Sequence, residues 1–143
     1  MYDRILFPTD GSDGTAVVAE HVGELATAMD ATVHVLSVVD TRNRFESPAS
    51  GLASEAWDEA ERERAAAAAA DAAAALPEDV PVETAVQEGV PDEEIVAYAT
   101  EHVDAIAMGT RGRTGVDRYL IGSVAERVVR RSPVPVLTVR IED

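Results

Sequence analysis

The feature that most constrains the fold is a regular alternation of two hydrophobic patterns along the chain. Short apolar runs rich in β-branched residues, such as residues 31–40, alternate with stretches in which apolar residues recur every three or four positions. The first pattern is typical of buried strands and the second of helices. Alternation of this kind predicts a parallel sheet with helices on both faces, because each strand is followed by a helical crossover. We therefore expect an α/β fold with a five-stranded parallel open sheet.

The expected elements follow from these patterns and from the breakers between them. The expected strands cover residues 5–7, 31–40, 80–89, 103–109 and 132–140, and Pro8 stops the first of them. The expected helices begin near residue 12 and at residues 55, 91 and 123. Ser12 or Asp13 is the predicted cap of the first helix, whose inward face carries Val18, Val22, Leu25, Ala26 and Met29. The length and the lack of a linker or repeat predict a single domain over residues 1–143.

The charge of the chain limits its partners. The formal net charge is −15, and all twelve basic residues are arginine, since lysine is absent. A surface this acidic repels nucleic acid and anionic membranes, so we expect neither as a partner. Molar salt, where the Debye length is about 3 Å, would screen the self-repulsion of such a surface. Together with the missing lysine, this favours a protein from a halophile.

The compartment and several classes of site follow from what the sequence lacks. The first ten residues, MYDRILFPTD, do not have the pattern of a signal peptide, and no apolar stretch approaches the roughly 20 residues of a membrane span. We therefore expect a cytoplasmic protein. With no cysteine there is no disulfide or thiolate site, and His21, His34 and His102 lack metal-type spacing.

A basic, glycine-rich stretch stands out in this acidic chain. Residues 109–123 read GTRGRTGVDRYLIGS, with glycines at positions 109, 112, 115 and 122. Glycine lets backbone N–H groups approach a ligand closely. Gly122 and Ser123 are expected where the last helix begins, and a helix N-terminus binds phosphate through free N–H groups and its dipole, here those of Val124 and Ala125. Six of the twelve arginines also lie between residues 111 and 131. This pattern predicts a polyphosphate site.

The position of this stretch also points to a ligand. In open parallel sheets, ligands bind beyond the carboxyl ends of the strands, where the strand order reverses. The stretch follows the expected fourth strand, and PTDGS at residues 8–12 follows the first. If these two strands are neighbours at the reversal, both segments face one crevice.

These residues resemble the universal stress protein family, and specifically its ATP-binding, UspA-like branch. That branch is marked by Gly-x-x-Gly-x9-Gly-Ser/Thr after the fourth strand, and Gly109, Gly112, Gly122 and Ser123 fit it without a gap. PTDGS and the segment SPVPVLTV at residues 132–139 are similar to family sequences as well. The resemblance covers the whole chain. It implies a Rossmann-like, adenine nucleotide alpha hydrolase-like fold with strand order 3-2-1-4-5.

The resemblance further implies ATP with Mg²⁺ as the ligand, with the metal held mostly by the phosphates and water. It also implies a homodimer formed through the fifth strand, at residues 133–139. The implied nucleotide contacts run from the adenosine to the outer phosphates: Pro8, Thr9 and Asp10 beside the adenosine, Val38 at the adenine edge through its backbone, Met108, Gly109 and Gly112 along the ribose and first phosphates, and Gly122, Ser123 and Val124 at the outer phosphates.

Other nucleotide and hydrolase classes do not fit. A P-loop needs lysine, a dinucleotide-binding turn needs Gly-x-Gly-x-x-Gly, and a nucleophile elbow needs Gly-x-Ser-x-Gly, none of which occurs. No residue is an obvious general base, since Asp10 is expected at the adenosine end. The favoured function is a nucleotide-responsive stress or signalling protein that binds ATP and is not primarily an enzyme. The alternatives are a slow ATPase or phosphotransferase, and a stress-response adaptor that does not use nucleotide.

Overall fold

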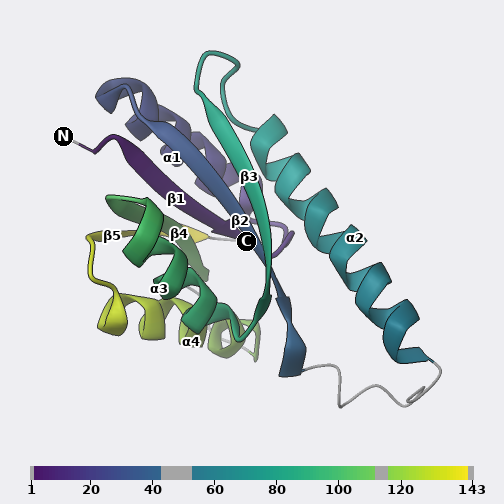
Figure 1. Ribbon diagram of the computed structural model, residues 1–143. Helices are drawn as coiled ribbons and strands as arrows, with labels where there is room; N and C mark the ends of the chain where they lie inside the picture. The colour runs from purple at the N-terminus through teal and green to yellow at the C-terminus, as the bar shows by residue number, and fades with distance from the viewer. Residues whose placement is uncertain (1, 43–52, 112–115, 142–143) are drawn as a thin grey trace.

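The computed structural model describes the chain except for residues 1, 43–52, 112–115 and 142–143 (Figure 1). In the described residues the strands form one sheet of order β3-β2-β1-β4-β5, and every neighbouring pair is parallel. This confirms the predicted α/β fold and its strand order. The elements in chain order are β1 (Arg4–Thr9), α1 (Thr15–Met29), β2 (Thr32–Asp40), α2 (Ala53–Ala74), β3 (Val82–Gly89), α3 (Pro91–His102), β4 (Ala105–Arg111), α4 (Val116–Arg131) and β5 (Val136–Ile141).

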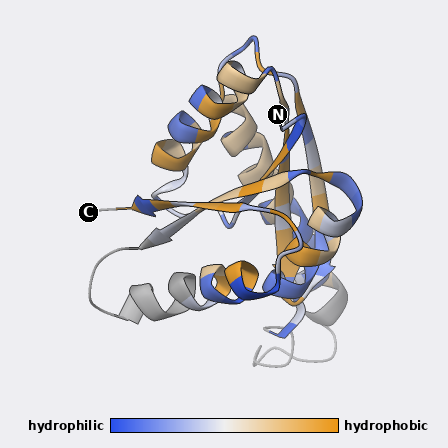
Figure 2. Ribbon diagram, turned by 90° about the vertical axis from the view of Figure 1, so that its left-hand side faces the viewer, coloured by the Kyte–Doolittle hydropathy of each residue, from blue (hydrophilic) through white to orange (hydrophobic). Residues whose placement is uncertain are grey.

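Helices cover both faces of the sheet. Ile5 and Phe7 of β1 point to the face covered by α1 and α2, whereas Leu6 points to the face covered by α3 and α4. Successive strand residues point to opposite faces, so strands covered on both sides read as continuous apolar runs. Figure 2 shows this as mostly orange strands between helices of mixed colour. The predicted inward face of α1 is confirmed, since its five residues are buried or pack against the core.

The centre of the sheet opens at its carboxyl edge. β1 pairs with β2 as far as Thr9↔Ser37, but its pairing with β4 covers only Ile5↔Ala105 and Leu6↔Ile106. β4 meanwhile continues beside β5 to Arg111↔Ile141. β1 and β4 therefore separate after Leu6, at the position where the strand order reverses. This is the place in an open parallel sheet where ligands bind.

Two predictions about the start of the chain are wrong. β1 does not stop at Pro8 but runs to Thr9. The Arg4 carbonyl accepts from the Asp104 N–H beside β4. Because the backbone groups of a strand alternate in direction, the Pro8 nitrogen points to the same side, toward β4. Pro8 lies beyond the last residue of β1 that pairs with β4, so its missing N–H leaves no ladder hydrogen bond unmade. Neither Ser12 nor Asp13 caps α1. Gly14 is the N-cap residue and has no side chain that could cap the helix, and the Ser12 carbonyl accepts from the Thr15 hydroxyl.

The start of α4 is the larger correction. The helix was expected from Ser123, but it begins at Val116, so Gly122 is its seventh residue and Ser123 its eighth. Asp117 suits the positive end of a helix, and Arg118, Leu120 and Ile121 are acceptable helix formers. One interior glycine lowers the stability of a helix by only about 1 kcal/mol relative to alanine, so it does not by itself end the helix. Gly122, Ser123 and Val124 thus lie inside a helix rather than at its N-terminus.

The last strand begins later than expected. It starts at Val136 instead of residue 132, because Pro133 and Pro135 offer no N–H to a ladder. The Pro135 carbonyl still accepts from the Ile106 N–H, which joins the segment to β4. Among the described residues, no helix is both long and apolar enough to cross a bilayer.

Candidate functional site

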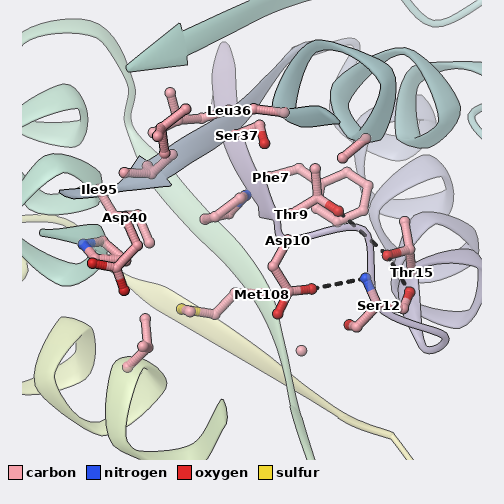
Figure 3. Close-up of a pocket in the computed structure, with 18 of the residues that line it drawn as sticks. Phe7, Thr9, Asp10, Ser12, Thr15, Leu36, Ser37, Asp40, Ile95 and Met108 are labelled. Carbon is pink, nitrogen blue, oxygen red and sulfur yellow. Dashed lines mark hydrogen bonds between the residues drawn. The ribbon is translucent and has the colours of Figure 1, made fainter. Parts of the chain in front are cut away.

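A cleft of about 590 Å³ lies where β1 and β4 separate (Figure 3). The ends of β1, β2 and β4 form its centre, and α1, α2, α3, α4 and the end of β5 contribute to its walls. Small-molecule sites are typically about 300–1,000 Å³ in volume. The cleft is therefore large enough to hold a ligand of nucleotide size.

Most of the predicted site residues meet in this cleft. Of the ten, seven line it: Pro8, Thr9, Asp10, Val38, Met108, Gly109 and Val124. Gly112 lies outside the described residues. Gly122 lies within α4, and Ser123, also in α4, is half-buried and is not among the lining residues. The cleft thus contains segments from both ends of the chain, and the binding role of each residue stays a prediction.

The inner part of the cleft is apolar. Leu36 from β2, Ile95 from α3 and Met108 from β4 face the cavity from three sides (Figure 3). Their side chains are buried within the core that α3 and α4 cover, so their positions are set by packing. Such a surface can take up a flat apolar ring, for which methionine is an adaptable contact.

The turn between β1 and α1 supplies the polar groups. The Ser12 N–H donates to Asp10 Oδ1 at 2.9 Å (Figure 3), and the Gly11 N–H donates to Thr9 Oγ1 at 3.1 Å. Gly11 has a φ of 78°, which glycine adopts without strain. Thr9 Oγ1 also lies 3.3 Å from Thr15 Oγ1. These bonds hold a carboxylate and two hydroxyls at the rim of the cleft.

Two ion pairs line the side of the cleft formed by β2 and α2. Arg42 donates to both oxygens of Asp40, from Nε at 2.9 Å and from Nη2 at 2.7 Å. This guanidinium lowers the pKa of Asp40, which keeps the carboxyl ionised at neutral pH. In α2, Arg64 Nε donates to Glu61 Oε2 at 2.9 Å. Each of these two arginines is thus partly neutralised by its own carboxylate.

These four charged residues are not among the site residues predicted from the sequence. Asp40 and Arg42 could have been found, because Asp40 ends β2 and Arg42 follows it, at the same edge of the sheet as PTDGS and the glycine-rich stretch. Glu61 and Arg64 belong to a charged helix run, and nothing local distinguishes them from a solvated helix face. Ile141 was missed as well, and it lines the cleft from the edge strand.

Comparison with known proteins identifies the family. The sequence profile of the universal stress protein family matches residues 1–140. The chain belongs to the universal stress protein family. It is 40% identical to universal stress protein MJ0531 of Methanocaldococcus jannaschii over 98% of this chain and 83% of that protein. The resemblance noted in the sequence is therefore confirmed at the level of the family.

Solved structures support the same assignment. The structure of MJ0577 from the same organism is similar, with a TM-score of 0.72 and 32% identity over 100% of this chain and 99% of that one. A universal stress protein solved in complex with cAMP has a TM-score of 0.65 and 26% identity, over 97% of each chain. Both share the fold of this universal stress protein.

Proposed function

We propose that this universal stress protein binds an adenine nucleotide, ATP with Mg²⁺, and acts as a nucleotide-responsive stress or signalling protein. It would do so as one domain formed by residues 1–143. The observation that carries the proposal is the cleft between the separated ends of β1 and β4, lined by seven of the residues expected at the nucleotide. A relative solved in complex with cAMP supports an adenine nucleotide as the ligand class.

The proposed pose follows the chemistry of the walls. The adenine would lie on the apolar inner surface beside Leu36 and Ile95, with its edge at the Val38 backbone. Asp10 and Thr9 would bond the adenosine end, because a carboxylate and a hydroxyl suit ribose and amino groups. The phosphates would then extend toward Gly109 and Val124, away from the carboxylates of Asp40 and Glu61. All of these residues line the one cleft.

The described residues fit a metal ion that arrives with the nucleotide. They contain no cluster of three or more histidine or acidic side chains able to hold a metal. Mg²⁺ usually keeps several waters and is bound by substrate phosphates with one or two carboxylates. Because Asp10 would bond the adenosine end, the Mg²⁺ would be held mostly by the phosphates and by water.

We also propose that two copies associate through residues 133–139. β5 lies at the edge of the sheet, and an exposed edge is a ready template for pairing. Leu137 on this strand is 45% exposed. Sedimentation analysis would test the dimer, and Leu137→Lys should shift the protein to a monomer. An unchanged mass for this variant would place any association elsewhere.

Nucleotide binding is tested by blocking the cleft from its rim. Ser12 lines the cleft with a half-buried side chain, whereas its neighbour Asp13 is exposed and does not. Titration calorimetry with Mg-ATP in molar KCl should give one nucleotide per chain for the wild type and for Asp13→Trp. Ser12→Trp, which fills the cleft, should lose binding. Equal binding by both variants would show that the ligand lies elsewhere.

The same purified protein distinguishes the proposed function from a slow ATPase or phosphotransferase and from an adaptor that does not use nucleotide. Steady release of ADP from bound ATP would favour the slow ATPase or phosphotransferase. No binding of ATP, ADP, AMP or cAMP by a folded wild type would overturn the proposal and favour an adaptor that works without nucleotide.

A further inference from the structure

One acidic side chain is buried outside the cleft, at the start of α3. Asp92 is the second residue of that helix and is 2% exposed. Its neighbours Glu93 and Glu94 are more exposed, as acidic residues in a first helical turn usually are. A buried carboxylate is costly unless it is paired, so its surroundings are informative.

Two arginines of α4 meet this carboxylate. Arg131 Nη1 donates to Asp92 Oδ2 at 3.3 Å, and Arg127 Nη1 lies 3.8 Å from Asp92 Oδ1. The second distance is within the range of an ion pair but is too long for a hydrogen bond. Among the described residues, Oδ1 has no hydrogen-bond partner although it is fully buried. A small approach of α4 to α3 would therefore complete a second bond.

The ion pairs of Asp92 lie next to the cleft. Pro91 and Ile95, which flank Asp92 on α3, line the cleft, and so does Val124 on α4. Val124, Arg127 and Arg131 are spaced by three and four residues, so they share one face of α4. At 1.5 Å per residue, the two arginines lie about 5 and 10 Å along the helix from Val124. Asp92 thus connects the two walls that Pro91 and Val124 form, as the adjacent α3 and α4 in Figure 1 illustrate.

We propose that Asp92 is a positioning residue for the phosphate end of the cleft. By holding Arg127 and Arg131 it fixes how far α4, and with it Val124, stands from α3. The inference rests on the proposed function, because it assigns to the ion pairs a part in the affinity for nucleotide phosphates.

Apolar packing alone does not fix the distance between α3 and Val124 of α4. Ile95 and Ala99 of α3 pack with Ala125 and Val128 of α4, and these small side chains bring the helices together. Apolar contact is non-directional, so it holds the two helices together without specifying one particular distance between Val124 and α3. A charge-assisted bond has a defined distance and direction, so it selects one such distance. Buried ion pairs often add little net stability, which agrees with a role in positioning.

The test compares an ion pair that joins α3 to α4 with an ion pair that lies within α4. Asp92→Asn keeps the shape and removes the charge. Glu126→Gln is the matched control, because Glu126 pairs with Arg130 on the exposed side of α4. Arg131→Met provides a second variant at an exposed position, in case Asp92→Asn does not fold. For each protein, calorimetry in molar KCl measures the affinity for Mg-ATP and for adenosine, which has no phosphate.

We expect Asp92→Asn and Arg131→Met to weaken Mg-ATP binding by roughly tenfold and to leave adenosine binding within about twofold of the wild type. The double variant should be no weaker than either single one, because both remove the same bond. Equal losses for ATP and adenosine, or an effect of Glu126→Gln as large as that of Asp92→Asn, would overturn the inference. If the folded wild type binds no adenine nucleotide, it is the proposed function that fails.

Discussion

Ile141 of β5 occupies the space beside Gly109 of β4 in which a larger residue would carry its side chain. A Cβ atom at Gly109 would lie 2.6 Å from Ile141 Cδ1 and 2.8 Å from Val18 Cγ2. Real side chains do not approach so closely. Gly109 therefore has a packing role that is independent of any ligand, since it lets the end of the edge strand close against the sheet and α1.

This contact predicts that Gly109→Ala destabilises the fold. The added methyl group must displace Ile141 and Val18, and forcing atoms into a packed core typically costs about 1–3 kcal/mol. Chemical denaturation in molar KCl measures the free energy of unfolding. Ile141→Val removes Cδ1, so it should cost less in the Gly109→Ala background than in the wild type. Equal costs in the two backgrounds would contradict the proposed clash.

A buried histidine predicts that acid destabilises the protein. His34 of β2 is 6% exposed, and its Nδ1 lies 2.7 Å from the Tyr98 hydroxyl. Burial lowers the pKa of His34 below its usual 6.5, assisted by the positive charge of Arg4 and by His102, while Glu83 acts in the opposite direction. The unfolded chain therefore binds a proton at a higher pH than the folded one.

The stabilising effect of His34 is present at neutral pH and is lost in acid. The contribution of His34 to stability is complete above pH 6.5 and is lost as the pH falls toward its folded-state pKa. Each unit by which the folded-state pKa is lowered corresponds to about 1.4 kcal/mol in the free energy of unfolding. The wild type should lose more free energy of unfolding than His34→Gln between about pH 7.5 and pH 5. His21→Gln is the control, because His21 is exposed on α1 and outside this cluster. Identical losses for wild type and His34→Gln would exclude the histidine as the cause.

The charge predicts a requirement for salt. With a net charge of −15, the folded chain repels itself and an incoming nucleotide. The Debye length falls from about 10 Å at 0.1 M to about 3 Å at 1 M, which screens both effects. We expect the free energy of unfolding to rise with KCl and ATP binding to be weak in dilute buffer, through loss of the fold, and to recover in molar KCl. Equal stability and affinity in both buffers would contradict adaptation to high salt.

How far the sequence predicts the structure depends on whether a feature is local. The order of the elements and the face of α1 follow from hydrophobic periodicity, and the position of the cleft follows from a topological rule. The extent of β1 depends on its pairing with β2 as far as Thr9↔Ser37 and on the early end of its pairing with β4, so Pro8 alone was a misleading signal. Asp92 and Arg131 are 39 residues apart, and no pattern in either helix marks them as partners. The glycine motif predicted a helix start at Gly122, but the helix begins at Val116, and no local pattern marks that start.

The position of Gly122 inside α4 gives a prediction that links stability to binding. Replacing an interior helix glycine with alanine is worth about 1 kcal/mol, so Gly122→Ala should raise the free energy of unfolding by roughly this amount. Within the helix, the N–H groups of Ser123 and Val124 are directed at carbonyls of the preceding turn. They become available to phosphate only if the first turns of α4 unwind, and alanine opposes that change.

Gly122→Ala should therefore weaken Mg-ATP binding by about fivefold, which corresponds to the same 1 kcal/mol. Adenosine serves as the internal control, because it has no phosphate to draw the helix open, and its affinity should not change. Calorimetry with both ligands in molar KCl measures the two effects on one preparation. A variant that is stabilised and yet binds Mg-ATP as tightly as the wild type would show that the phosphates are held without unwinding of α4. In that case Gly109 and the neighbouring end of β4 would have to provide the phosphate contacts.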